Sequence, residues 1–223
     1  MVIQSEPGNS LIRINPGYLR RKRIVDLSLT LLLAPFLLLA AAVVVLLIRL
    51  DSPGPVLFRQ KRLGANGSEF TMYKFRSMYA NCDEAAHRQA IKEFIQGKAL
   101  NSNTIRSYKL EGDPRITRIG RFIRATSLDE LPQFWNVLRG DMTLVGPRPP
   151  IPYEAAYYNE YHWLRLSGKP GLTGLWQVYG RSRVKFQEMV EMDITYLQQQ
   201  SIWQDLKLII LTLPIMCKGH GGL

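Results

Sequence analysis

A long uncharged segment near the N-terminus constrains the fold of this chain more than any other feature. No residue from Leu27 to Ile48 is charged, and residues 31–48 are apolar throughout. About 22 residues, each rising roughly 1.5 Å along a helix, reach across the hydrocarbon core of a bilayer. The run continues well past residues 40–42, the one small-residue site suited to cleavage, which disfavours a cleaved signal peptide. The segment therefore predicts a membrane helix.

Pro35 interrupts this segment, and a proline bends a helix because it removes one backbone hydrogen bond. Basic residues flank the segment on both sides, at Arg13, Arg20, Arg21, Lys22 and Arg23 before it and at Arg49, Arg59, Lys61 and Arg62 after it. Because cytoplasmic flanks carry the positive excess, a helical hairpin bent at Pro35 would keep both flanks in the cytoplasm. A single-pass anchor kinked at Pro35 is the alternative, and charge alone leaves both open.

A β-hairpin is predicted after this segment. Residues 56–62 and 69–76 have strand character, and the Asn66-Gly67 pair between them favours a tight turn. At a period of two residues, Lys74 and Arg76 share one face of the second strand. That face is either a cationic surface for a phosphate or an ordinary solvated one.

Three less regular segments follow. Residues 80–96 predict a polar helix, and residues 97–113 predict a mobile loop that could act as a lid. Residues 113–124 alternate arginines with apolar residues at helical spacing. Such a basic amphipathic stretch suits the headgroup plane of a membrane, although a surface helix over the core has the same pattern.

Two adjacent carboxylates, Asp129 and Glu130, lie at the predicted start of a helix that ends at Arg139 and Gly140. Ser127 and Glu130 have the spacing of a capping box. Acidic residues in a first helical turn stabilise the helix dipole and need no catalytic role.

Arg148 gives these carboxylates a second interpretation. It lies between Pro147 and Pro149, which restrict the backbone on both sides. A guanidinium group fixed in advance loses little entropy when it binds a phosphate. Acids with arginines on both sides, Arg121 and Arg124 before and Arg148 after, indicate a site for a metal-bound phosphate.

The C-terminal third contains aromatic residues, a glycine-rich loop and two predicted helices. The aromatic residues of 152–166 suit either a membrane interface or core packing. Residues 169–181, which include Gln177 and Arg181, form a loop whose glycines let backbone amides approach a ligand. A helix from Phe186 to about Gln199 contains Asp193. Another, opened by Ser201 with Gln204, contains Asp205 and runs to Cys217; its apolar end is too short to span a bilayer.

Composition excludes several classes of protein. The net charge of +11 indicates a polyanionic partner: nucleic acid, an anionic membrane or a phosphorylated substrate. The two cysteines, Cys82 and Cys217, match no metal-binding spacing and indicate a reducing compartment. The three histidines form no zinc motif, which disfavours hydrolases built on histidine.

Taken together, these motifs resemble the monotopic phosphoglycosyl transferases, also called bacterial sugar transferases. Four segments carry the resemblance: the proline-broken apolar helix with its basic flanks, Lys74-Phe75-Arg76-Ser77-Met78, Asp113 through Pro149, and Pro170 to Arg181. The resemblance implies a mainly helical α+β fold with a re-entrant helix-break-helix, a small β-hairpin and amphipathic interfacial helices around the active site. It divides the chain into a lead-in (1–19), a re-entrant membrane hairpin (20–50) and a membrane-associated catalytic domain (51–223). The chain looks like the catalytic core of the family, without the extra membrane helices of larger members.

The resemblance also implies an activity, which is transfer of a sugar 1-phosphate from a UDP-sugar to a polyprenyl (undecaprenyl) phosphate with release of UMP. The family works by ping-pong catalysis through a phosphosugar-aspartyl intermediate, in the first membrane step of surface glycoconjugate assembly. Its location is the cytoplasmic face of the bacterial inner membrane. Besides the two substrates, the expected partner is the lipid bilayer and not nucleic acid, and a homodimer is left open.

By motif position, Asp129 would be the nucleophile and would hold Mg²⁺ together with Glu130. The residues expected to bind substrate phosphates are Lys74, Arg76, Arg124 and Arg148. Further site candidates are Gln177, Arg181, Asp193 and Asp205, and Pro35 marks the membrane break.

Two other classes of protein compete with this one. A non-catalytic, membrane-anchored basic protein that binds anionic lipid or nucleic acid would account for the charge and the apolar helix. A nucleotide-sugar transferase with an Asp-x-Asp metal motif is disfavoured because the sequence lacks that motif.

Overall fold

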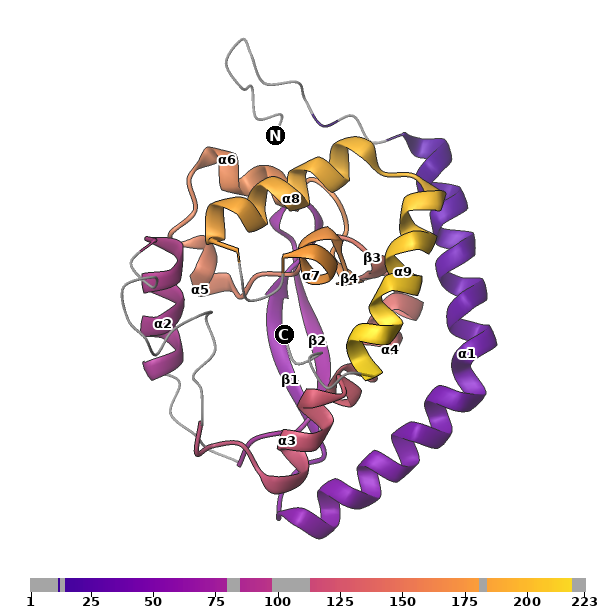
Figure 1. Cartoon of the computed structure of the whole chain (residues 1–223), viewed down its shortest axis with the longest axis vertical. Coiled ribbons are helices and arrows are strands. Elements are labelled where there is room, and N and C mark those ends of the chain that lie inside the picture. The colour runs from indigo at the N-terminus through magenta and orange to yellow at the C-terminus, as the bar shows by residue number, and fades with distance from the viewer. Residues whose placement is uncertain (1–11, 13–14, 80–84, 98–112, 181–183, 218–223) are drawn as a thin grey trace.

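The computed structural model describes residue 12 and residues 15–79, 85–97, 113–180 and 184–217. Most of the predicted loop at 97–113 therefore lies outside the described residues. Figure 1 shows the arrangement: a long hairpin at the centre, short helices around it, and one long helix along one side. The predicted α+β, mainly helical class is confirmed.

In chain order the elements are α1 (Pro16–Asp51), β1 (Leu57–Leu63), η1 (Ala65–Gly67), β2 (Glu69–Phe75), α2 (Ala85–Ile95), α3 (Arg118–Ala125), η3 (Leu128–Glu130), α4 (Gln133–Arg139), β3 (Thr143–Val145), α5 (Pro152–Ala155), α6 (Glu160–Trp163), η4 (Leu164–Leu166), β4 (Gly171–Thr173), α7 (Leu175–Tyr179), α8 (Phe186–Gln199) and α9 (Ile202–Cys217). Elements marked η are single 3₁₀ turns.

Helix α1 contains the whole apolar segment. Asn15 caps its start by accepting a hydrogen bond from the Gly17 N–H at 2.8 Å. The helix continues through Pro35 and bends about half-way along its length (Figure 1). Pro35 therefore does not end the helix, and the predicted re-entrant arrangement stays a prediction. A proline removes only one hydrogen bond, and the leucines and alanines around it favour helix strongly enough to continue.

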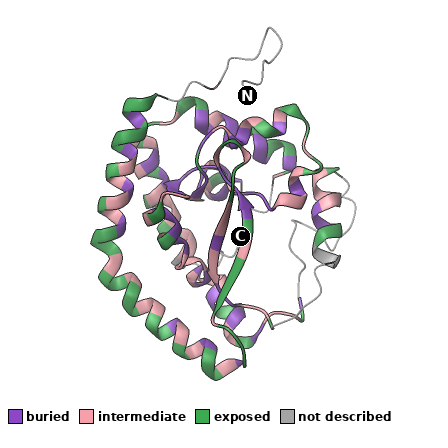
Figure 2. Ribbon diagram, turned by 180° about the vertical axis from the view of Figure 1, so that it is seen from behind, coloured by how far each residue is buried: buried purple, intermediate pink, exposed green. Residues whose placement is uncertain are grey.

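The two ends of α1 are packed against the rest of the protein, and its middle is not. The buried residues of α1 are Tyr18, Lys22, Asp26 and Thr30 in its first half and Val44 and Ile48 in its second. Between Thr30 and Val44 none is buried, and Phe36 is 73% exposed. Figure 2 shows α1 coloured in green (exposed) and pink (intermediate) along this stretch. Of the most apolar 18-residue stretch of α1, only 11% is buried, whereas the core helix of a soluble protein is mostly buried.

By length and composition, α1 is the one helix within the described ranges that could cross a membrane. Among the residues that the structure describes, none buries the apolar middle of α1. An uncovered apolar surface of this length needs an apolar environment, which a bilayer provides.

The predicted hairpin is confirmed. Strands β1 and β2 pair antiparallel, with Leu57 opposite Phe75. Instead of a two-residue turn, a 3₁₀ turn connects them, with left-handed backbone at Asn66 (φ 55°) and Gly67 (φ 75°). Asparagine and glycine tolerate this conformation best, which explains the pair at this place.

The predicted single helix from Ser127 to Arg139 is wrong in its first half. Residues 128–130 form a 3₁₀ turn, and α4 begins only at Gln133, after Pro132. Ser127 has left-handed backbone (φ 57°), and its side chain makes no capping hydrogen bond. The capping box is therefore wrong too, because a left-handed residue cannot act as a regular N-cap. The predicted end is confirmed: Gly140 closes α4 at φ 85°.

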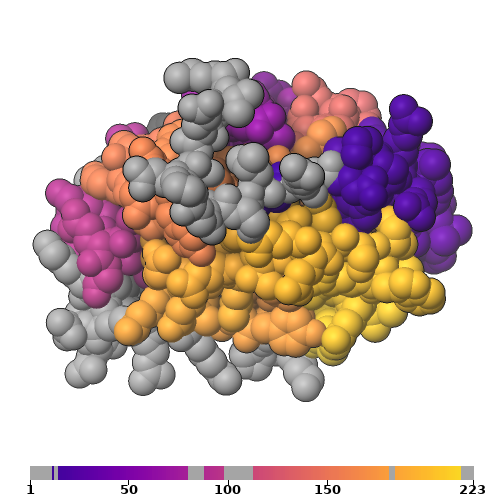
Figure 3. Space-filling model, turned by 90° about the horizontal axis from the view of Figure 1, so that it is seen from above, coloured from indigo at the N-terminus to yellow at the C-terminus, as the bar shows by residue number. Residues whose placement is uncertain are grey.

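The main core lies between the hairpin, α4 and the two C-terminal helices. It contains Met72 of β2, Val137 of α4, Val145 of β3, Leu197 of α8 and Leu208 of α9. Both C-terminal helices are confirmed, and the Gln204 N–H donates to Ser201 Oγ at 3.2 Å at the start of α9. In Figure 3, seen from above, α8 and α9 lie beside the start of α1.

The aromatic stretch 152–166 contributes mostly to a second core. Tyr158 and His162 pack against Phe186 of α8, with the His162 and Phe186 rings 4.9 Å apart and edge-on. Tyr157 and Trp163 are 41% and 37% exposed. Of the two interpretations of this stretch, core packing therefore describes Tyr158 and His162.

A second sheet, which the sequence analysis did not predict, holds the segment around Arg148. Strands β3 and β4 are three residues each and pair parallel. They continue into a close backbone contact at Gly146, where an added Cβ would lie 2.5 Å from the Lys169 carbonyl oxygen. Gly146 therefore lets the Gly-Pro-Arg-Pro segment lie directly against residues 169–171.

We expect Gly146→Ala to destabilise the protein by about 1–3 kcal/mol, the usual cost of overpacking, because backbone on both strands must move. Gly64→Ala is the matched control: its Cβ would meet the Phe70 ring at 3.3 Å, and that ring can shift. Thermal unfolding in detergent measures both variants. Equal unfolding temperatures would contradict the close packing described here.

Candidate active site

An ion pair joins the central hairpin to the adjacent carboxylates. Lys74, near the end of β2, places its Nζ 2.6 Å from Oε1 of Glu130 in the 3₁₀ turn η3. Both side chains are partly buried, at 20% and 24% exposed. The hairpin thereby presents a cation directly to the Asp129–Glu130 pair.

Asp129 is the buried member of that pair, at 8% exposure. Burial and, to a smaller extent, the negative charge of Glu130 raise the pKa of its carboxyl group, and the net value is about 6. The positive charges of Lys74 and Arg124 act in the opposite direction and lower this pKa. At neutral pH the group is therefore mostly an ionised carboxylate, poorly hydrated and surrounded by cations.

Arg124 reaches this site from the last turn of α3. Its charge also acts on Asp113, whose pKa is lowered mainly by hydrogen bonds from Arg115. The basic amphipathic stretch thus packs against η3, and its Arg124 contributes a positive charge near Asp129. The structure brings together four of the predicted site residues: Lys74, Arg124, Asp129 and Glu130.

Arg76 has its hydrogen bonds elsewhere. Its guanidinium donates to the Pro53 and Ser52 carbonyl oxygens, at 2.9 and 2.6 Å, and to Ser52 Oγ at 2.9 Å. Here Arg76 holds the chain where it leaves α1. Phosphate binding by Arg76 stays a prediction.

Arg148 belongs to a second cluster. Its Nη1 lies 3.5 Å from Oε2 of Glu154, and its carbonyl oxygen accepts a hydrogen bond from Arg165. Arg165 is fully buried and forms an ion pair with Asp193 of α8. Asp193 therefore neutralises the arginine that holds the Arg148 backbone.

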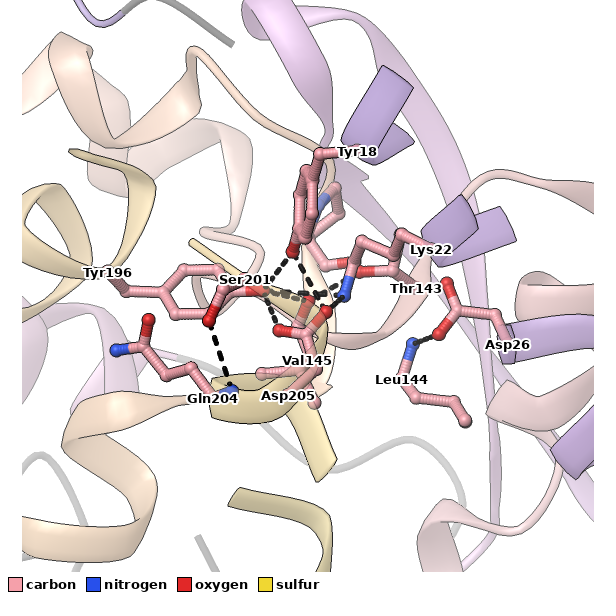
Figure 4. A network of polar contacts seen from close by, with 11 residues as sticks. Tyr18, Lys22, Asp26, Thr143, Leu144, Val145, Tyr196, Ser201, Gln204 and Asp205 are labelled. Carbon is pink, nitrogen blue, oxygen red and sulfur yellow. Dashed lines mark hydrogen bonds and ion pairs between the residues drawn. The ribbon is translucent and has the colours of Figure 1, made fainter. Parts of the chain in front are cut away.

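Asp205 lies in a third cluster, at the start of α1 (Figure 4). Its carboxylate accepts hydrogen bonds from Lys22 Nζ and Tyr18 Oη at 2.8 Å each, and from Tyr196 Oη at 2.6 Å. Tyr196 Oη also lies 3.0 Å from the carbonyl oxygen of Val145. This cluster fixes the strand that leads into Gly146 and Arg148.

Gln177 is buried in α7, where its Oε1 lies against Gly174; a Cβ on that glycine would come within 2.4 Å of the oxygen. Arg181 lies outside the described residues. Arg165 and Glu154 cannot be recognised from the sequence, because they carry no motif. The sequence does contain a signal for Lys22, because polar residues recur every four positions at Tyr18, Lys22, Asp26 and Thr30 and so share one helix face.

The described residues contain no group of three or more His, Cys, Asp or Glu side chains that could hold a metal ion by themselves. Asp129 and Glu130 nevertheless fit Mg²⁺, which commonly binds through one or two carboxylates together with substrate phosphates and water. Glu130 would then share its carboxylate between Lys74 and the ion.

Comparison with known proteins identifies the family. The bacterial sugar transferase family matches residues 18–219. The chain belongs to that family. It is 45% identical over 207 residues to galactosyl transferase CpsE of Streptococcus agalactiae. The matched region covers 92% of this chain and 44% of that protein.

Two further relatives are similar over most of the chain. The UDP-glucose:undecaprenyl-phosphate glucose-1-phosphate transferase of Caulobacter vibrioides is 42% identical over 221 residues, 93% of this chain and 73% of that protein. The undecaprenyl-phosphate galactose phosphotransferase of Salmonella typhimurium is 41% identical over 170 residues, 76% of this chain and 35% of that protein. The chain thus spans less than half the length of the streptococcal and Salmonella relatives.

In this bacterial sugar transferase, the left-handed Ser127 sets the direction of the turn that carries Asp129. We expect Ser127→Val to destabilise the protein by about 1–2 kcal/mol, because a left-handed backbone is costly for a β-branched side chain. Ser127→Gly should be as stable as the natural protein, since glycine adopts this backbone readily. Unfolding temperatures of the three proteins measure the effect. Equal temperatures for the valine and glycine variants would refute it.

Proposed function

We propose that this protein transfers a sugar 1-phosphate from a UDP-sugar to a polyprenyl phosphate, giving a polyprenyl diphosphate sugar and UMP. The names of the Caulobacter and Salmonella relatives support both the donor class and the undecaprenyl-phosphate acceptor. The observation that carries the proposal is the burial of the Asp129 carboxylate among Lys74, Arg124 and Glu130.

In the first step, a carboxylate oxygen of Asp129 attacks the phosphorus that bears the sugar. The bond from that phosphorus to the bridging oxygen breaks, and UMP leaves with the bond's electrons. An acyl phosphate that carries the sugar remains on Asp129. A buried carboxylate suits this role because it has little hydration to lose before attack.

In the second step, a phosphate oxygen of the polyprenyl phosphate attacks the same phosphorus. The acyl phosphate bond breaks, and Asp129 returns to its carboxylate form. Neither step requires the protein to supply a general base, so the site needs cations more than histidines. Lys74 and Arg124 stabilise the charge of the transferring phosphate, and bound Mg²⁺ would supply further positive charge between Asp129, Glu130 and the diphosphate.

The arrangement of α1 favours re-entry over a complete crossing. At its start, Lys22 pairs with Asp205; at its end, Asp51 Oδ2 accepts a hydrogen bond from the Ile119 N–H at 3.2 Å. Both ends therefore pack on the same domain, while the exposed middle is apolar. A spanning helix would carry one end to the opposite side of the bilayer, away from that domain.

Several shorter elements also expose apolar side chains that suit the membrane interface. Phe122 of α3 and Trp135 of α4 are 52% and 56% exposed, and α9 exposes Ile210 and Leu213. Such surfaces on helices that carry basic residues are typical of interfacial membrane binding. They would hold the carboxylate pair at the depth of a lipid phosphate, on the cytoplasmic face of the bacterial inner membrane. The product fits the first membrane step of surface glycoconjugate assembly.

The covalent step can be tested without the lipid acceptor. Purified protein incubated with a UDP-sugar and Mg²⁺ should release about one equivalent of UMP and gain the mass of a sugar phosphate on Asp129, because the first step is independent of the acceptor. Peptide mass spectrometry locates the adduct. Lys207→Gln, on the exposed part of α9, serves as the control and should form the adduct like the natural protein.

Asp129→Asn should form no adduct and lose at least about a thousandfold in turnover, as expected when a nucleophile is removed. UMP release only in the presence of lipid, with no adduct, would support direct transfer instead. An Asp129→Asn variant with unchanged function would support the non-catalytic, charge-binding alternative.

Re-entry of α1 can be tested by cysteine labelling in a background without Cys82 and Cys217. Ser5→Cys, before α1, and Gln198→Cys, on the exposed face of α8, should both react with an impermeant thiol reagent only after spheroplasts are opened. Both positions then lie on the cytoplasmic side. Labelling of Ser5→Cys in intact spheroplasts would establish a single crossing and overturn the re-entrant arrangement.

A further inference from the structure

Asn136 joins α4 to the strand that carries Lys74. The side chain is fully buried, with no exposed surface. Its Oδ1 accepts a hydrogen bond from the Tyr73 N–H at 3.1 Å, and its Nδ2 donates to the Thr71 carbonyl oxygen at 2.7 Å and to Asp141 Oδ2 at 3.1 Å. Both ends of the amide are therefore occupied, two of its three hydrogen bonds being made to the backbone of β2.

The Asn136 side chain bonds to the backbone of β2 in the way that a neighbouring strand would. In the described part of the chain, strand β2 pairs with β1 along one edge, and Thr71 and Tyr73 present the opposite edge. Alternate residues of a strand direct their backbone groups to the same edge, so one amide bridges the carbonyl of Thr71 and the N–H of Tyr73. Asn136 thus satisfies backbone groups that an unpaired edge would leave open, and it fixes the strand against α4.

This contact lies next to Lys74 in the sequence and in space. Side chains alternate along a strand, so Met72 and Lys74 point to the same face of β2. Met72 packs in the main core with Val137, the residue after Asn136. Lys74, one position further along that face, reaches Glu130 at 2.6 Å.

A closed circuit of contacts results. It runs from Lys74 to Glu130 by the ion pair, from Glu130 to Asn136 through η3 and α4, and from Asn136 back to β2 by two hydrogen bonds. The ammonium group of Lys74 is flexible, whereas the two hydrogen bonds of Asn136 and the packing of Met72 against Val137 hold the strand against α4. The backbone carbonyl of Asn136 also closes α4 by accepting the N–H of Gly140 at 3.1 Å.

We propose that Asn136 is a positioning residue for the reaction: its amide holds β2 where Lys74 lies against the Asp129–Glu130 pair. This inference rests on the proposed transferase function. The side-chain hydrogen bonds of Asn136 go to Thr71, Tyr73 and Asp141 and not to either carboxylate of the pair, so Asn136 acts through Lys74. Removal of Asn136 should therefore already cause part of the loss of activity that removal of Lys74 causes.

A double-mutant cycle tests this coupling. Asn136→Ala, Lys74→Met and the double variant are compared in kcat/KM for UMP release from a UDP-sugar, with unfolding temperatures measured in parallel. We expect Asn136→Ala to lower kcat/KM about tenfold in the natural protein and less than about threefold when Lys74 is already methionine, since residues that act through one another are non-additive. The loss should appear mainly in kcat.

Thr212→Val is the control for a buried polar contact outside this circuit. Its hydroxyl lies 2.8 Å from Thr173 Oγ1 and bonds to the Leu208 carbonyl oxygen, so its loss should lower stability with little change in kcat. Asn136→Ser, which leaves room for water to bridge the strand, provides a milder variant if the alanine variant does not fold.

If Asn136→Ala lowered kcat/KM by the same factor in the natural protein and in the Lys74→Met variant, the positioning role would be overturned. The positioning role would also be overturned if kcat/KM of the Asn136 variants fell only in proportion to the fraction of unfolded protein. A natural protein that releases no UMP from any UDP-sugar would instead overturn the proposed function. The same cycle, measured on unfolding temperatures, would then still decide whether Asn136 and Lys74 are coupled.

Discussion

The buried ion pair between Lys22 and Asp205 holds the first and last helices of this protein together. Both side chains are almost fully buried, and Tyr18 and Tyr196 complete the hydrogen bonding of the carboxylate. Removal of one member of such a pair costs about 3–5 kcal/mol, because the other charge stays buried without a partner. Because α1 has no buried residue between Thr30 and Val44, its position depends mainly on what fixes its two ends.

The opposite end of α1 connects to the candidate active site. Asp51 accepts the Ile119 N–H at the start of α3, and Arg76 holds Ser52 and Pro53. Helix α3 also carries Arg124, whose charge acts on Asp129. The two anchors therefore place the apolar middle of α1 at a fixed position relative to the carboxylates. In the proposed reaction, whose acceptor is a lipid phosphate, that relation would set the depth at which the chemistry takes place.

Much of this fold follows from local sequence patterns, and the part that does not follow depends on distant contacts. The hairpin, α8, α9 and the glycine end of α4 were predicted because period, caps and turn residues are local signals. The capping box at Ser127 was wrong, since Pro132 and the packing of η3 against β2 and α3 override a local match. The β3–β4 pair was missed because two three-residue strands carry almost no periodicity.

The same distinction explains which of the predicted site residues lie together in the structure. Lys74, Arg124, Asp129 and Glu130 converge, as expected of a phosphate site, whereas Asp193 and Asp205 pair with buried cations. Sequence alone cannot separate a charge that meets a substrate from one that holds the backbone. Arg23 illustrates this, because it lies in a basic flank yet donates to the Val137 and Leu138 carbonyl oxygens at the end of α4. Part of the net charge of +11 therefore stabilises helix ends and loops, and only the remainder is available to attract phosphates and anionic lipid.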